Sequence, residues 1–339
     1  MEQLSLQFRR FAEECRESSP LYEHLAESIS KDSELLLLAA SARKGQPVPN
    51  LLFAAVHELL LSGSKHTLAD YYASTCRGAP LPAGDAFPSF KSFCLEHRAQ
   101  IEFRLQNRLV QTNEAGRCAY LYPAFCTIYS IAQKPLALIE LGTSAGLQLM
   151  WHKYGYDYGD RAIVGNPQSE LILHAVPKGV IAPPIHSASP PVAAAVGIDL
   201  HVNDLCSANH LLWLKALIWP EHTDRRIQLE QAAKVLLEQP PKLLEGDAVE
   251  LLPTVAAAMP KGAALVVFHT HVANQFSADT KQKLIHYICT LGQTRDVYHL
   301  CNNMQDVLLH LDYWKDGQLF RHALAETEGH GRWFRWLES

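Results

Sequence analysis

The chain has 339 residues, of which 48% are hydrophobic and 19% are charged, so it can bury sizeable cores and general disorder is excluded. Thirty basic and thirty-five acidic residues give a formal net charge of −5, which argues against a nucleic-acid partner held by a broad basic surface. No apolar run approaches the roughly 18–20 residues of a membrane span, and acidic residues interrupt the N-terminal stretch where an export signal is basic and apolar. We therefore expect a cytoplasmic protein of about two domains with no membrane partner.

The first part of the chain, residues 1–130, is predicted to be a helical domain. Large apolar residues recur at helical spacing from Leu4 to Cys15 and form a single stripe. Further helices are predicted over residues 22–42, 51–61 and 88–109. No useful period-two alternation precedes residue 130, so we expect no strand there.

From residue 131 the pattern changes to short strands that alternate with helices. Apolar runs predict strands over residues 136–141, 192–200, 263–269 and 296–300, and a further strand is expected in the stretch 241–247, ending before Gly246. Helical patterns lie between them over residues 210–218, 224–238 and 278–291. This alternation predicts an α/β domain over residues 131–339, whose mostly parallel sheet has helices on both faces. An irregular insertion rich in Gly and Pro is expected at about 154–191.

The turn after the first predicted strand is the most informative motif, and it runs from Glu140 through Gly142, Ser144, Ala145 and Gly146. Gly-x-Ser-x-Gly fits the nucleophile elbow of a serine hydrolase, but that fold needs several strands before the nucleophile and here only helices precede it. The motif can also be interpreted as a ligand-binding turn. Its first glycine would permit the tight bend, and its second would let a ligand approach the backbone at a helix N-terminus. The alternative is that the motif is an ordinary strand-to-helix turn that binds no ligand.

The charge of this turn indicates which ligand would suit it. The dinucleotide fingerprint requires a glycine where this chain has Ser144. Glu140 suits a positively charged ligand better than a pyrophosphate, which favours S-adenosylmethionine with its ammonium and sulfonium groups. Asp199 lies at the C-terminal end of the second predicted strand, where an acid can accept both ribose hydroxyls. Asp247 and Ala248 follow the third, where an acid can receive an adenine amino group beside a small residue.

This ordered set of acids resembles the class I S-adenosylmethionine-dependent methyltransferases. Their glycine-rich first motif matches 140–146, their second-strand acid matches Asp199, and their third-strand Asp-Ala pair matches Asp247 and Ala248. The resemblance implies a Rossmann-like methyltransferase fold for residues 131–339. It also implies S-adenosylmethionine as cofactor, with Glu140 holding the methionine ammonium, Asp199 the ribose and Asp247 the adenine.

Over almost its whole length the chain is similar to the bacterial family known as domain of unknown function 2332. The similarity rests on Asn113-Glu114-x-x-Arg117, Glu140-Leu141-Gly142-x-Ser144-Ala145-Gly146-Leu147, Gly197-Ile198-Asp199-Leu200, Trp213-Leu214-x-Ala216-Leu217-Ile218-Trp219-Pro220, Gly246-Asp247-Ala248 and Val267-Phe268-His269-Thr270. Three positions depart from the expected pattern: Gln148 stands in place of Asn, His152 in place of an acid and Asn203 in place of Pro.

Two histidines after the fourth predicted strand, His269 and His271, are the candidate catalytic residues. A histidine titrates near neutrality and can serve as a general base if the methyl acceptor must lose a proton. The alternative is that they only hydrogen-bond across the loop. No third ligand is identifiable near them, and the eight cysteines are scattered without zinc-finger spacing, so we expect no metal site. The Asn/Asp-Pro-Pro-aromatic signature of amino-group methyltransferases is absent here, which disfavours an adenine or glutamine amide as acceptor.

Asn113, Glu114 and Arg117 are substrate-side candidates, which would face the pocket if the helical domain covers the sheet and would otherwise form a local cap. The arginines of the Trp219–Arg226 stretch could meet an anionic substrate, although a solvated helix start is the favoured interpretation. The leading hypothesis is a methyltransferase acting on an unidentified small molecule. The alternatives are a non-catalytic protein that binds S-adenosylmethionine or a nucleotide, and, third, a serine hydrolase.

Overall fold

The computed structural model describes residues 1–111, 113–159 and 162–337, and within them the chain forms two compact units. One unit comprises residues 1–111 and Ser207–Ile227, and the other comprises Asn113–Cys206 and the chain from Gln228 onward. None of the described helices is long and apolar enough to cross a membrane.

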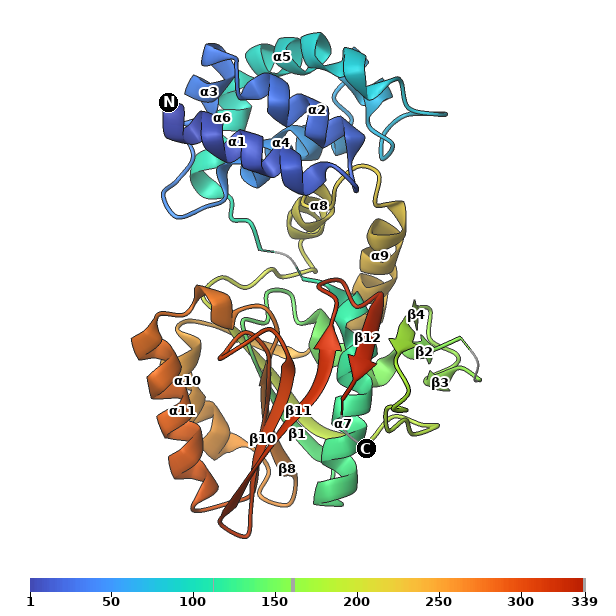
Figure 1. Cartoon of the computed structure of the whole chain (residues 1–339), viewed down its shortest axis with the longest axis vertical. Helices are drawn as coiled ribbons and strands as arrows, with labels where there is room; N and C mark the ends of the chain where they lie inside the picture. Colours follow the sequence, from blue (N-terminus) through green and yellow to red (C-terminus); the bar gives the residue numbers. More distant parts are fainter. Residues whose placement is uncertain (112, 160–161, 338–339) are drawn as a thin grey trace. The chain divides into compact units, whose positions relative to one another are not determined.

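Among the described residues of the first unit, all regular secondary structure is helical, as predicted (Figure 1). Its main helices are α1 (Glu2–Cys15), α2 (Pro20–Ile29), α3 (Ser33–Ala39), α4 (Val48–Leu61), α5 (Ala86–Glu96), α6 (Arg98–Asn107) and α8 (Ala208–Ala216). The predicted helix over 22–42 is two helices, because the Asp32 side chain caps α3 by accepting bonds from the backbone N–H groups of Glu34 and Leu35. The predicted helix over 88–109 is likewise divided, at His97.

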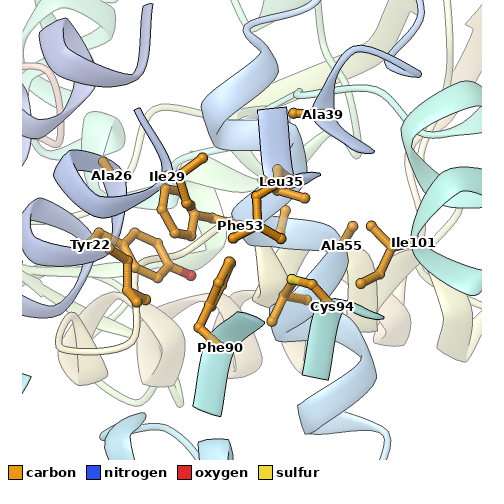
Figure 2. Close-up of a cluster of buried hydrophobic side chains, with 14 of the residues drawn as sticks. Tyr22, Ala26, Ile29, Leu35, Ala39, Phe53, Ala55, Phe90, Cys94 and Ile101 are labelled. Carbon is orange, nitrogen blue, oxygen red and sulfur yellow. The ribbon is translucent and has the colours of Figure 1, made fainter. Parts of the chain in front are cut away.

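The core of this unit is a cluster of buried aromatic and aliphatic side chains, most of them from α1 to α6 (Figure 2). Phe53 lies at its centre, with its ring stacked on Tyr22 at 4.2 Å and on Phe11 at 5.5 Å between centroids. Burial of these apolar surfaces is the main term that stabilises the unit.

The segment 207–227 belongs to the helical unit, whereas the sequence places it in the second domain. Trp213 donates its indole N–H to the Leu109 carbonyl at 2.8 Å, and His57 Nδ1 contacts the Ala216 carbonyl at 3.0 Å. Glu221 accepts the Ser19 hydroxyl at 2.7 Å and the backbone N–H of Leu21 at 3.3 Å. These contacts join residues that lie more than a hundred positions apart, so no local pattern indicates them.

The second unit is built on a nine-stranded sheet with the order β5-β12-β11-β10-β9-β8-β1-β6-β7. Its strands are β1 (Leu136–Leu141), β5 (Val176–Lys178), β6 (Val192–Asp199), β7 (Lys242–Glu245), β8 (Ala264–His269), β9 (Val297–Cys301), β10 (Leu309–Lys315), β11 (Gln318–Thr327) and β12 (Trp333–Trp336). The run from β7 to β9 is parallel, and β10, β11 and β12 continue it with antiparallel pairing. The predicted parallel strands are all present, within about two residues at each end.

Helices cover both faces of this sheet (Figure 1). One face packs on α10 (Ala248–Ala258) and α11 (Ala278–Gly292), and the apolar cluster there includes Ile139 and Val267. The other face packs on α7 (Cys118–Ala132), whose Phe125 contacts Phe268 edge-on at 5.3 Å. Helix α7 therefore belongs to the sheet unit, so the boundary lies at residue 113 rather than near 130. Helix α9 (Thr223–Glu238) leads from one unit into the other.

The insertion predicted at 154–191 contains short strands rather than wholly irregular chain. Strands β2 (Gly155–Asp157), β3 (Val164–Gly165) and β4 (Ile172–His174) form a small sheet of order β3-β2-β4. Strand β5 leaves it and pairs with β12 at the edge of the large sheet.

Candidate functional site

The turn after β1 has the backbone geometry that its glycines predict. Gly142 and Gly146 have positive φ angles of 72° and 80°, and Ser144 between them has a φ of 50°. A Cβ at Gly142 would lie 2.6 Å from a methyl group of Val272, so this turn and the loop after β8 approach closely. A short 3₁₀ helix (Leu147–Lys153) follows, where the sequence predicts the start of an α-helix.

Hydrogen bonds connect this turn to the loops after β6 and β7. The backbone N–H of Gly142 donates to the Ile198 carbonyl, and that of Ser144 donates to Asp199 Oδ2, each at 2.8 Å. Asp199 Oδ1 accepts the N–H of His201 at 3.1 Å, and the Asp199 carbonyl accepts the N–H of Gly246 at 2.8 Å. The loops at the carboxyl ends of three neighbouring strands are therefore held as one rigid edge.

Glu140 is buried at the end of β1, on the face of the sheet that packs against α7. Its Oε2 accepts the Thr143 hydroxyl at 2.5 Å. Burial, and to a lesser extent the nearby charge of Asp199, raises the pKa of Glu140 to about 8, although Thr143 and Arg117 act in the opposite direction. The structure thus brings two predicted carboxyl groups, Glu140 and Asp199, into electrostatic contact.

Asp247 caps helix α10, and it is exposed. Its Oδ1 accepts the backbone N–H groups of Val249 at 2.9 Å and Glu250 at 3.0 Å, which is ordinary N-cap geometry. Ala248 is half-buried beside it. Asp247 lies at the same edge of the sheet as Asp199, because strands β6 and β7 are parallel neighbours.

Asn113, Glu114 and Arg117 lie against the turn after β1, and Asn113 clamps that turn. Its amide donates to the Thr143 carbonyl at 3.1 Å, and its Oδ1 accepts the N–H of Leu147 at 3.0 Å. The carbonyl of Glu114 accepts the side-chain amide of Gln148 at 3.4 Å. Asn113 thus holds the turn after β1 through side-chain hydrogen bonds to its backbone.

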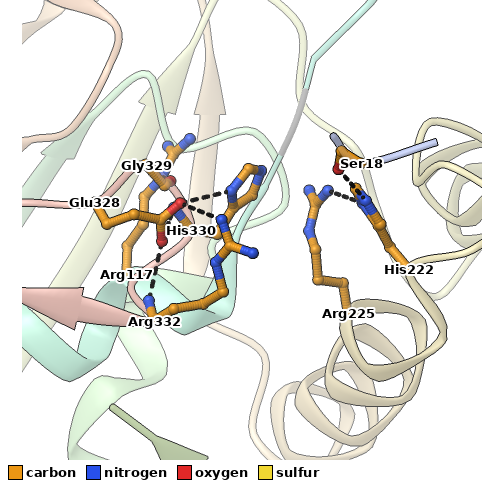
Figure 3. Close-up of polar contacts among 8 residues, drawn as sticks. All are labelled: Ser18, Arg117, His222, Arg225, Glu328, Gly329, His330 and Arg332. Atoms are coloured by element: carbon orange, nitrogen blue, oxygen red, sulfur yellow. Dashed lines mark hydrogen bonds and ion pairs between the residues drawn. The ribbon is translucent and has the colours of Figure 1, made fainter. Parts of the chain in front are cut away.

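Arg117 and His271 lie beside a loop near the C-terminus, Glu328–Arg332, of which Figure 3 draws Glu328, Gly329, His330 and Arg332. Arg117 Nε donates to the Gly329 carbonyl at 2.9 Å, and Glu328 pairs with His330 and Arg332 at 3.1 and 3.0 Å. His271 has a φ of 57°, and its N–H donates to Asn302 Oδ1 at 2.8 Å. Burial, and to a lesser extent the nearby Arg117 and His330 side chains, lowers the pKa of His271 to about 4, so His271 is neutral at neutral pH.

His269 does not join the group around Glu140, because the alternation of side chains places the two on opposite faces of the sheet. Glu140 pairs in register with Phe268, which faces α7, whereas the neighbouring His269 faces α11. His269 is fully buried, and its Nε2 lies 3.1 Å from His299 Nε2. Burial and the neighbouring His299 lower its pKa well below the usual range.

The three departures from the family pattern all lie in the second unit. Gln148 is buried and accepts the Thr270 hydroxyl at 2.9 Å, and Asn203 donates its amide to the Ser144 hydroxyl at 3.0 Å. Burial lowers the pKa of His152 to about 4. Gln148 and Asn203 thus support the loops of the candidate site.

In the helical unit, His222 and Arg225 form a local network at the start of α9 (Figure 3). Arg225 donates to His222 Nδ1 at 3.1 Å, so His222 Nε2 carries the ring hydrogen and donates to the Ser18 hydroxyl at 2.7 Å. This network anchors the helix start.

Sequence reasoning missed Thr143, Asn302 and the loop Glu328–Arg332. Thr143 stands inside the quoted motif, and a hydroxyl three residues after a buried acid was a usable signal. Asn302 follows the fifth parallel strand, where polar residues at strand ends gather at one edge of the sheet. The loop is distant in sequence and no local pattern indicates its position.

The architecture defines an α/β protein whose helical N-terminal region precedes a mixed, largely parallel nine-stranded sheet with helices. Residues 5–336 match the model of the family described as "Uncharacterized protein conserved in bacteria (DUF2332)", and the chain belongs to that family. The match confirms the family predicted from the motifs. No curated protein matches the chain.

Proposed function

We propose that the protein is an S-adenosylmethionine-dependent methyltransferase that acts on an unidentified small-molecule acceptor. The observation that carries the proposal is the buried pair of carboxyl groups, Glu140 and Asp199, at the ends of two adjacent parallel strands. Two acids this close together favour a cationic ligand, which would relieve their mutual repulsion.

The order of the parallel strands supports this location for a ligand. Across the sheet the parallel strands lie in the order β7, β6, β1, β8, β9. If these five strands are numbered by their sequence, this spatial order is 3-2-1-4-5, which is the Rossmann-type order. Ligands of such sheets bind outside the carboxyl ends of the strands where the order reverses, here between β1 and β8. Gly142 after β1 and Val272 after β8 flank that point.

The residues expected to contact the ribose, the adenine and the methionine ammonium all lie at the carboxyl ends of the parallel strands. Asp199 lies at the end of β6 beside the turn after β1, where its carboxylate would meet the ribose hydroxyls of a bound nucleoside. Asp247 uses Oδ1 for the helix cap, which leaves Oδ2 to receive an adenine amino group. Glu140, once ionised, would hold the ammonium group.

S-adenosylmethionine, when bound, supplies an electrophilic methyl group. The residues of the chain would orient the acceptor and exclude water from the reaction. His271 is the better placed of the two candidate bases, because it lies with Arg117 at the Glu328–Arg332 loop, whereas His269 faces α11.

The two alternative functions are a non-catalytic binding protein and a serine hydrolase. A non-catalytic binding protein would use the same carboxyl groups without an acceptor site. A serine hydrolase would need a base on Ser144, whose hydroxyl in the described part of the chain is bonded by the Asn203 amide, a donor that cannot take up a proton. The positive φ of Ser144 is the one feature that favours the hydrolase.

Isothermal titration calorimetry of the full chain with S-adenosylmethionine and S-adenosylhomocysteine tests the proposal. We expect binding of both, and a loss of affinity of more than about tenfold in Asp199→Ala. Asp204→Ala is the matched control, because Asp204 is exposed on the same loop and its Oδ1 accepts the backbone N–H of the neighbouring Cys206. Circular dichroism would verify that both variants remain folded.

Three outcomes separate the candidate functions. Absence of binding by the folded wild-type chain would overturn the methyltransferase and the binding protein together. Binding with no methyl transfer to any acceptor in a broad panel would favour the binding protein. Covalent labelling of Ser144 by a fluorophosphonate would favour the hydrolase.

A further inference from the structure

A second polar cluster lies on the α11 face of the sheet, away from Glu140 and the turn after β1. His269 on β8 pairs in register with Cys301 on β9, and the adjacent pair in the ladder joins Val267 to His299. Residues two positions apart on a strand share a face, so His269, His299 and Cys301 all point to the same side. All three are buried, although the surrounding cluster is apolar.

The three side chains converge on one point. One nitrogen from each histidine and the Cys301 sulfur all lie within 4.8 Å of one another. The two Nε2 atoms are 3.1 Å apart, which suits two ligands of a single tetrahedral ion, since each metal–nitrogen bond is about 2.0–2.1 Å.

We propose that His269 Nε2, His299 Nε2 and Cys301 Sγ bind one Zn²⁺ ion. A borderline-soft ion is favoured by a mixed set of imidazole and thiolate ligands, and Zn²⁺ accepts such sets in tetrahedral geometry. On binding, the Cys301 thiol loses its proton to solvent and the two imidazoles stay neutral, so the occupied site carries one net positive charge. No oxidant or reductant is required.

The fourth coordination position would face a cavity of about 280 Å³. His299 and Cys301 line this cavity together with His310, Asp312 and Trp314 from the neighbouring strand. Three protein ligands beside an open, partly polar space are typical of zinc sites that keep one position for water or a small ligand. The site is independent of the proposed methyltransferase function, because it lies on the opposite face of the sheet.

Local sequence spacing does not reveal this cluster. His269 and His299 are thirty positions apart, and only the pairing of β8 with β9 brings His269 beside Cys301. The other two ligands are therefore not identifiable from the residues near His269 in the sequence.

Cobalt substitution of the full-length chain, freed of any affinity tag, tests the site. Co²⁺ bound to a thiolate gives a charge-transfer absorption in the near ultraviolet, which adventitious binding to the seventeen histidines of the chain cannot give. We expect this band to saturate at one ion per chain and to disappear when Zn²⁺ is added. It should be absent in Cys301→Ser and retained in Cys289→Ser, a matched control whose thiol lines the same cavity but stands outside the cluster.

A second variant keeps the test decisive if Cys301→Ser does not fold. His299→Gln retains the thiolate and removes one imidazole, so Zn²⁺ affinity measured by competition with a chromophoric chelator should fall by more than about tenfold. Absence of the cobalt band in the folded wild-type chain would overturn the proposal. Persistence of the band in folded Cys301→Ser would do the same.

Discussion

Gly331→Ala is expected to lower the free energy of unfolding by about 3 kcal/mol or more, because the new side chain has no room. Gly331 is buried with a φ of 80°, and a Cβ there would overlap the Gly116 carbonyl oxygen and lie 2.9 Å from the backbone nitrogen of Arg117. These are backbone atoms at the start of α7, which cannot rotate away as a flexible side chain can. Urea denaturation with a two-state fit would measure the change.

Gly317→Ala is the control for the backbone strain alone. Gly317 has a φ of 75°, but it is exposed and its Cβ would meet no heavy atom within 4 Å. It should therefore cost only roughly 1–2 kcal/mol. Equal losses in the two variants would contradict the close packing of the Glu328–Arg332 loop on Arg117.

Replacing Glu140 by glutamine is expected to flatten the pH dependence of stability between about pH 7 and pH 8.5. The pKa of Glu140 is raised to about 8 in the folded chain, above its unfolded value, so its stabilising contribution is present at low pH and lost as the pH rises through 8. Wild type should lose about 1 kcal/mol relative to Glu140→Gln across this interval, from the linkage of proton binding to unfolding. Denaturant unfolding at a series of pH values measures the difference.

Other groups do not obscure this comparison. The buried histidines have lowered pKa values and change stability mainly below pH 7, and they are present in both proteins. Glu238→Gln, at an exposed position at the end of α9, should retain the wild-type slope. Identical slopes for wild type and Glu140→Gln would show that the carboxyl group is ionised throughout, contrary to the expected pKa.

The same titration links stability to the proposed ligand. A ligand ammonium beside Glu140 would hold the carboxyl group ionised and lower its pKa. Saturating S-adenosylmethionine should therefore remove most of the extra pH dependence of the free energy of unfolding that distinguishes wild type from Glu140→Gln. The pH dependence of Glu140→Gln itself should be unchanged.

The secondary structure of the sheet unit was largely predictable, because the signals for it are local. Strand β1 has the predicted bounds, and the Gly142 and Gly146 positions adopt the positive φ angles of a tight turn. The hairpin of β10 and β11 is absent from the predicted elements, although Asp316-Gly317 between alternating apolar residues is a strong signal for one. Asp316 and Gly317 both have positive φ angles, as such a turn requires.

The candidate site was predictable in part for a related reason. Acids at the ends of parallel strands meet at one edge of the sheet, so Glu140, Asp199 and Asp247 could be grouped from strand order alone. The face to which each side chain points could not be assigned in the same way. Glu140 and His269 both end strands, yet the register of β1 with β8 directs them to opposite faces.

Periodicity, turn chemistry and motif spacing are properties of neighbouring residues, so they were enough to predict most of the helices, the parallel strands, the glycine-rich turn and the family. Long-range packing places α7 in the sheet unit and residues 207–227 in the helical one. The tertiary structure alone brought His269, His299 and Cys301 together. Such associations depend on strand register and on packing between distant segments, which local sequence does not encode. The boundaries of the two units follow long-range contacts rather than the order of the chain.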